Sequence, residues 1–234
     1  WRVGALLLGL IACAPFGGES RRAPDGGVGV EHAGRTDAAS PPALDASTIV
    51  EAGATTSRYA AAVLADQPLA YWRLNDPPSA TKILDEVTMG LEGAVTSGSV
   101  TLGATGARAA TGTALALDTA LFSLGERFGF PGTTAFTIEL WLRTTNPDFA
   151  HVVTKQDRTP NSSKSGYALF VQDGVITFER WAEGEDAKVS AGGISAVYAH
   201  VAAVYDGAAI GLYVDGVATT PKSTTLVVPA TAAP

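Results

Sequence analysis

The chain of 234 residues has a formal net charge of −7, and 46% of its residues are hydrophobic. This hydrophobic share is ordinary for a chain that buries a core. The acidic balance argues against a nucleic-acid partner, because a phosphate backbone attracts a basic patch. The first residue is Trp1 and the only methionine is Met89, so we expect the start of the gene product to be missing.

Residues 1–12 are typical of a secretory signal peptide whose start is missing. The apolar run that follows Arg2 extends to Ala12, and about ten apolar residues are too few to cross a bilayer as a helix. The run ends in Leu10-Ile11-Ala12-Cys13, which resembles the bacterial lipobox. This resemblance implies cleavage before Cys13 and lipid on its sulfur, which would anchor the protein in the cell envelope, at the outer membrane or cell surface. Cys13 is the only cysteine, so no internal disulfide is expected; an incidental cysteine after an ordinary signal peptide is the alternative.

The composition of residues 13–57 predicts a disordered tether that begins at the lipidated cysteine. The segment is rich in Ala, Gly, Pro, Asp and Ser, and runs such as Ser40-Pro41-Pro42 interrupt both helices and strands. With so few apolar residues to bury, the segment cannot offset its chain entropy. We expect it to hold the folded domain away from a membrane.

The pattern of residues 58–234 predicts one all-β domain. One or two helical turns are expected at Tyr59–Leu64, followed by an aromatic strand at Leu69–Leu74. Two Asp-Gly pairs, at 206–207 and 215–216, are typical of tight turns between strands. Short strands separated by frequent turns favour a β-sandwich. The further strands are predicted at Ala114–Leu117, Phe136–Arg143, Val152–Lys155, Tyr167–Gln172, Val175–Arg180, Val197–Tyr205 and Ile210–Asp215.

Four segments in this order resemble bacterial laminin G-like domains. They are YAAAVLADQPLAYWRLND (59–76), DEVTMGLEG (85–93), FTIELWLR (136–143) and the pair HVAAVYDG and LYVDG within 200–216. The resemblance implies a concanavalin A-like jelly-roll sandwich. Family members continue beyond the point that corresponds to Pro234, so we expect a domain truncated at its C-terminus. Tyr198-Ala199-His200 stands where the family often has Trp-His-His.

Glycoside hydrolases share this fold and need two carboxylates about 5–10 Å apart on one face. Glu139 is the only acid on the Phe136–Arg143 strand, and the acids at 183–186 lie in a predicted solvated loop. The three histidines are scattered, and His200 is expected at a strand edge with a backbone hydrogen bond. The sequence therefore predicts that the protein is not an enzyme. A second acid facing Glu139 or Glu179 would favour a hydrolase instead.

Calcium is the metal that the resemblance suggests. Lys155-Gln156-Asp157-Arg158 is similar to one acidic loop of the pentraxin calcium site, which carries over only Asp157. Oxygen ligands of this kind suit Ca²⁺. A plain polar loop without metal is the alternative.

Exposed aromatic rings are what a sugar would stack on. On the strand that begins at Val175, Ile176 alternates with Thr177, Glu179 and Trp181, so these three share the face turned away from the core. Trp181 is the candidate platform, with core packing as its alternative, whereas Trp72 and Trp141 are assigned to the core. The function expected is a lipid-anchored module that binds carbohydrate or an extracellular protein. A hydrolase-associated module and a structural adhesion protein without a small ligand remain open.

Overall fold

The computed structural model describes residues 5–7, 58–87, 91–107, 112–125, 127–157 and 164–230, and of residues 5–7 only the backbone. Cys13 and the predicted tether lie outside the described residues, so their predicted roles stay predictions. Within the described ranges no helix is long and apolar enough to span a membrane. The elements are β1 (Ala5–Leu7), α1 (Arg58–Ala65), β2 (Ala94–Thr105), β3 (Thr113–Ser123), β4 (Phe136–Leu142), β5 (Ala150–Asp157), β6 (Ser165–Gln172), β7 (Val175–Ala182), β8 (Glu185–Ala191), β9 (Ala199–Tyr205), β10 (Ala209–Val214), β11 (Val217–Ala218) and β12 (Lys222–Ser223).

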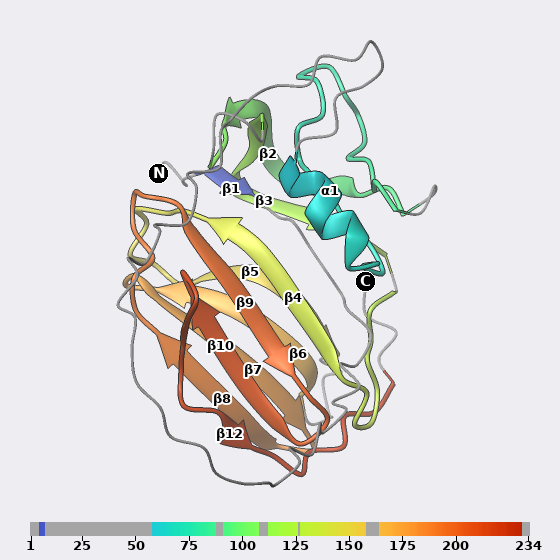
Figure 1. Ribbon diagram of the computed structural model, residues 1–234, viewed down its shortest axis with the longest axis vertical. Coiled ribbons are helices and arrows are strands. Elements are labelled where there is room, and N and C mark those ends of the chain that lie inside the picture. Colours follow the sequence, from blue (N-terminus) through green and yellow to red (C-terminus); the bar gives the residue numbers. More distant parts are fainter. Residues whose placement is uncertain are drawn as a thin grey trace, which may run out of the picture. The chain divides into compact units, whose positions relative to one another are not determined.

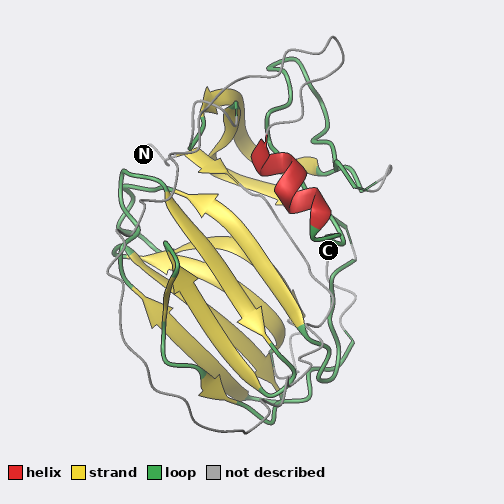
Figure 2. Cartoon of the chain, in the orientation of Figure 1, coloured by secondary structure: helices red, strands yellow, loops and turns green. Residues whose placement is uncertain are grey.

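Two antiparallel sheets make up the folded domain. The eight-stranded sheet has the order β11-β10-β9-β4-β1-β3-β2, with β12 also paired to β10, and the four-stranded sheet has the order β5-β6-β7-β8 (Figure 1). The helix α1 is the only helix among the described residues (Figure 2). The predicted all-β sandwich with a concanavalin A-like jelly-roll architecture is confirmed.

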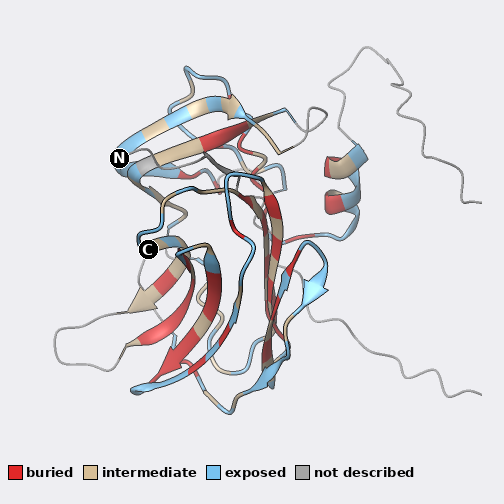
Figure 3. Ribbon diagram, turned by 90° about the vertical axis from the view of Figure 1, so that its left-hand side faces the viewer, coloured by how far each residue is buried: buried red, intermediate tan, exposed pale blue. Residues whose placement is uncertain are grey.

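The core lies between the two sheets, and strict alternation along the strands supplies it. In β4 and β9 every second residue is buried and the residues between are half-buried, as a period of two requires when one face of a sheet meets another layer. Leu140 and Leu212 are both buried, as the sequence predicts. Figure 3 shows these buried positions on both sheets and exposed positions in the turns. Aromatic rings close one part of the core, where Phe136 packs at 4.8 Å from Tyr167 and 6.0 Å from Phe178, centroid to centroid.

The turn chemistry explains the registers of the hairpins. At Asp215-Gly216 both residues have positive φ, 51° and 80°, which is the conformation of a tight hairpin turn whose twist matches that of the strands. Asp206-Gly207 differs, because only Gly207 has positive φ, at 99°. There Oδ1 of Asp206 accepts hydrogen bonds from the backbone amides of Ala208 and Ala209 at 2.8 and 2.7 Å. The side chain, rather than a second positive φ, therefore closes this loop.

Two sequence predictions of local structure are wrong. The aromatic segment Leu69–Leu74 is not a strand, since only Trp72 forms a bridge, to Asp85, and Leu74 has a positive φ of 57° that interrupts an extended run. Residues 185–191, part of which was predicted as a solvated loop, form β8. This strand faces the core with Ala187 and Val189, which are small enough to give a weak apolar signal.

The short strand β1 occupies an unexpected place in the large sheet. Its residue Leu6 pairs with Leu115 of β3 on one side and with Leu142 of β4 on the other. In the order of the sheet, β1 thus lies between β3 and β4. The residues of β1 belong to the predicted signal peptide, whose removal stays a prediction. The structure assigns the same apolar run a second use, as a strand.

Candidate functional site

The predicted sugar-binding residues lie on the outer face of the four-stranded sheet. Ile176 and Phe178 belong to the core, so Thr177, Glu179 and Trp181 alternate with them on the opposite face of β7. The indole Nε1 of Trp181 donates a hydrogen bond to Oε1 of Glu179. The Thr177 and Ser190 hydroxyl oxygens are 2.8 Å apart and share a hydrogen bond. The structure therefore brings Glu179 and Trp181 into contact, whereas Thr177 shares their face and bonds to Ser190.

Trp181 is not the exposed platform that the sequence predicts. Only 6% of its surface is exposed. The ammonium nitrogen of Lys164 lies 3.3 Å from the centroid of its ring, a cation–π contact. Lys164, which directly precedes β6, therefore covers the ring. The alternation of residues within β7 could not reveal this contact.

A second aromatic group lies on the same outer face, around the start of β5. The rings of Phe149 and Phe170 have centroids 4.9 Å apart, and Phe149 and His151 lie 4.8 Å apart edge to face. Phe149 is 49% exposed. Sequence reasoning missed this group; the alternation of Phe149 and His151 before a predicted strand was the signal for it.

Asp157, the predicted calcium ligand, is the last residue of β5 and pairs with Ser165 of β6. Across the described part of the chain, no three His, Cys, Asp or Glu residues gather closely enough to hold a metal ion. Residues 158–163, which follow Asp157, lie outside the described residues. Calcium binding at Asp157 stays a prediction.

The outer face of the eight-stranded sheet carries a polar pair that the sequence analysis did not predict. Oε1 of Glu139 on β4 lies 2.8 Å from Nε2 of His200 on β9, and the two side chains are 26% and 27% exposed. The ring of Trp141 lies 5.0 Å from the His200 ring. The predicted side-chain bond of His200 to the backbone is therefore wrong, since its imidazole meets a carboxylate. Trp141 is not enclosed in the core but half-buried on the outer face.

The helix α1 and the segment after it form an aromatic wall beside this pair. Trp141 Nε1 donates a hydrogen bond to the hydroxyl of Tyr59 at 3.1 Å, and Val63 packs with Tyr71 in a small apolar cluster. Burial, followed by the nearby hydroxyl of Tyr59 and the carboxylates of Glu86 and Glu139, raises the pKa of Tyr71 to about 12. Tyr71 is therefore a neutral hydroxyl at ordinary pH.

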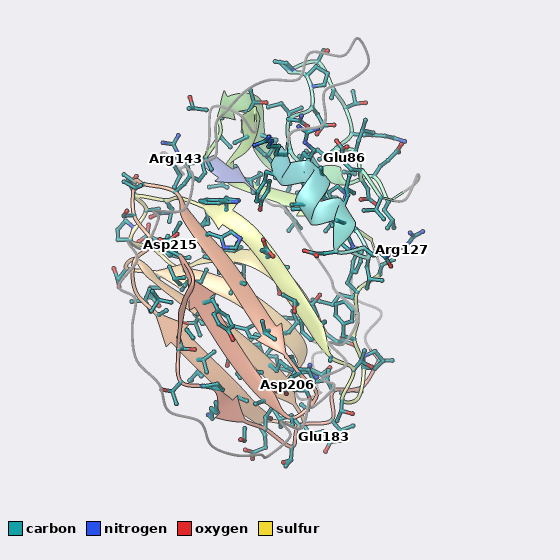
Figure 4. The ribbon with its side chains drawn as sticks, in the orientation of Figure 1. Glu86, Arg127, Arg143, Glu183, Asp206 and Asp215 are labelled. Carbon is teal, nitrogen blue, oxygen red and sulfur yellow. The ribbon has the colours of Figure 1, made fainter. Side chains whose placement is uncertain are left out.

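The hydrogen-bonding neighbour of Glu139 is an imidazole rather than a second carboxylate. Glu86, which lies beside α1 in Figure 4, forms an ion pair with Arg73 at 3.6 Å. Glu179 is bonded to an indole and faces Lys188 across the strands. Among the described residues, neither Glu139 nor Glu179 thus has a second acid as its hydrogen-bond partner.

A cavity of about 330 Å³ lies where β3 faces β5. Its lining is mainly apolar and includes Leu115, Leu117, Phe122, Val153 and Tyr167. Arg127, His151 and Lys155 also line it.

The comparisons with known proteins address the fold. The laminin G-type family model described as the concanavalin A-like lectin/glucanases superfamily matches residues 97–234. Neither the curated proteins nor the solved structures compared with the chain include a match. The resemblance seen in the sequence is thereby confirmed for the domain. That superfamily includes both glycosidases and proteins without enzymatic activity.

Proposed function

Because the chain belongs to the concanavalin A-like lectin/glucanases superfamily, we propose that it is a glycan-binding module, anchored by lipid on Cys13 in a bacterial cell envelope. It binds rather than cleaves its ligand, which is an extracellular carbohydrate polymer. Glu139 is the only acid on the Phe136–Arg143 strand, which supports binding over hydrolysis. The predicted tether would present the domain away from the membrane.

The observation that carries this proposal is the setting of Trp181. Its ring lies on the outer face of the sheet and not in the core, and its surroundings are polar: Glu179 at the indole nitrogen and Lys164 over the ring face. Aromatic rings offer an apolar surface to the C–H groups of a sugar, and carboxylate, ammonium and hydroxyl groups bond its hydroxyls. Lys164 occupies the position that a stacked sugar would take, so a ligand must displace it.

The test is a glycan array with the full chain, two variants at the proposed site and one control variant. Trp181→Ala removes the platform and is expected to abolish binding. Lys164→Ala uncovers the ring and is expected to leave binding intact or strengthen it. Lys82→Ala, a lysine that pairs with Glu92 in another part of the domain, is the matched control. Binding by Trp181→Ala equal to that of the unaltered chain would contradict the proposal, and release of sugar from any bound glycan would show an enzyme.

The lipid anchor has a separate test. Expression of the full chain in bacteria with labelled palmitate should label the unaltered protein and leave Cys13→Ser unlabelled. Equal labelling of both proteins would show that Cys13 is not the attachment site. The membrane fraction should contain the unaltered protein and lose Cys13→Ser.

A further inference from the structure

The pair Glu139–His200 belongs to a larger group that the proposed function does not use. We define the β4–β10 site as Glu139 and Trp141 on β4, His200 on β9 and Tyr213 on β10. Across the sheet Glu139 pairs with Ala202, which pairs with Tyr213. Glu139, Ala202 and Tyr213 therefore point to the same, outer face of the sheet. Glu139 and Tyr213 are two strand spacings apart, about 9.5 Å.

One small residue, Ala202, forms the floor between Glu139 and Tyr213. Gly211 lies in the next row of the same face, opposite Val204. A Cβ atom built on Gly211 would meet one atom, Cε2 of Tyr213 at 4.0 Å. The space above Gly211 is therefore open, and Tyr213 is exposed at its side. The floor leaves room for a ring-sized ligand between a carboxylate and an aromatic side chain.

The helix α1 limits this face on one side only. Tyr59 of α1 meets Trp141 through a hydrogen bond and an edge-to-face ring contact, with centroids 6.4 Å apart. In Figure 1, α1 lies by the upper end of β4, and no helix covers β9 or β10. The β4–β10 site thus has an aromatic wall at the β4 side and is open toward β10.

The pair at the centre keeps hydrogen-bonding capacity for a ligand. Oε1 of Glu139 is bonded to Nε2 of His200, and, within the part of the chain that is described, no protein group bonds to Oε2 of Glu139 or Nδ1 of His200. The two groups hold each other in place through this bond. A carboxylate oxygen accepts from one hydroxyl, and an imidazole nitrogen bonds to another. A sugar ring carries several hydroxyls and therefore suits such a pair of groups.

We infer that the β4–β10 site binds one hydroxyl-bearing sugar residue, held by Glu139 and His200 beside the rings of Trp141 and Tyr213. The site lies on the sheet opposite to the one that carries Trp181. It is therefore a second glycan contact, independent of the one proposed above. A polymer bound at both faces would engage two molecules of the protein or wrap around one.

The test follows His200 directly in the full chain. With histidine labelled at ¹³Cε1, three ring signals are expected, from His32, His151 and His200, and His200→Gln assigns the third. Cellohexaose, xylohexaose, laminarihexaose and maltohexaose are titrated in turn. We expect a saturable shift of the His200 signal with at least one of them, and loss of at least tenfold in affinity in Glu139→Gln.

A blocking variant separates this site from the Trp181 site. Ala202→Leu fills the floor between Glu139 and Tyr213, and its unfolding midpoint is measured beside that of the unaltered chain. It should abolish the His200 shift, whereas Trp181→Ala should leave that shift unchanged. No His200 shift with any of the four sugars overturns the inference, as does an undiminished shift in folded Ala202→Leu. A shift lost only in Trp181→Ala would assign the glycan to the other face.

Discussion

Replacement of Leu140 by alanine tests the central claim of the fold, that β4 packs its alternate side chains between the two sheets. Leu140 is 1% exposed and pairs with Val201 in the middle of the large sheet. The change removes about three carbons, each contributing about 0.8 kcal/mol by transfer from water, or about 2.4 kcal/mol. The strands around it are fixed by hydrogen bonds on both sides, so the cavity cannot close fully. The cavity raises the expected loss to about 3–4 kcal/mol.

The measurement is equilibrium unfolding of the full chain in urea, followed by tryptophan fluorescence. The midpoint of Leu140→Ala should fall while the slope with urea stays constant. Leu84→Ala is the matched control, because Leu84 is 56% exposed and the same truncation there should cost less than about 1 kcal/mol. Losses that agree within about 0.5 kcal/mol in the two variants would refute the placement of β4 in the core.

Three further changes probe other parts of the domain. Arg180 is buried, and burial lowers its pKa. Among the described residues its Nε and Nη1 have no hydrogen-bond partner. Arg180→Met should therefore unfold at an equal or higher urea concentration, since a buried charge is removed at similar volume. Gly166 has a φ of 118°, and a Cβ there would lie 1.9 Å from a backbone oxygen; Gly166→Ala should cost more than about 3 kcal/mol, while Gly184→Ala, with no atom within 4 Å, should cost about 1 kcal/mol. Tyr71 has a pKa raised to about 12 by burial against about 10 in the unfolded chain, so stability should fall as pH rises from about 10 to 12, and Tyr71→Phe should make that fall less steep in pH-dependent thermal unfolding.

The strands with strict alternation were predictable from the sequence. The alternation of apolar and other residues predicts strands at Phe136–Arg143 and Ile210–Asp215, and the structure has them at Phe136–Leu142 and Ala209–Val214. The period of two is visible in such segments because one face meets the core and the other does not. The same signal fails at residues 185–191, where the core side carries Ala187 and Val189 among charged residues.

Aromatic content misled the prediction for residues 69–74. Tyr71 and Trp72 are buried, but individual contacts rather than a ladder of strand pairs hold them. The indole of Trp72 donates to the carbonyl of Leu91 at 2.8 Å, and the backbone amide of Tyr71 donates to Asp85 at 2.7 Å. Buried aromatics and β propensity give the same local pattern, and the sequence alone does not separate them.

The candidate sites depended on contacts between distant segments. Thr177, Glu179 and Trp181 could be placed on one face because a single strand carries them. The Glu139–His200 pair joins residues 61 positions apart, and only the register of β4 against β9 brings them together. Lys164 over Trp181 likewise depends on how the segment before β6 meets β7. Pairings of this kind are set by strand register, which local sequence does not determine.

Residues 5–7 cannot both form β1 in the sheet and be removed by the predicted cleavage before Cys13. A molecule in which Leu6 bridges Leu115 and Leu142 keeps residues 5–7 in the sheet, whereas a molecule cleaved before Cys13, as the sequence predicts, would lack β1 between β3 and β4. Unpaired edges attract any extended chain that can add to them. Cleavage would therefore leave the edges of β3 and β4 that face β1 unpaired, and another strand would have to pair with them. The backbone amides of β3 and β4 that face β1 would report, by their exchange with solvent, which form a sample contains.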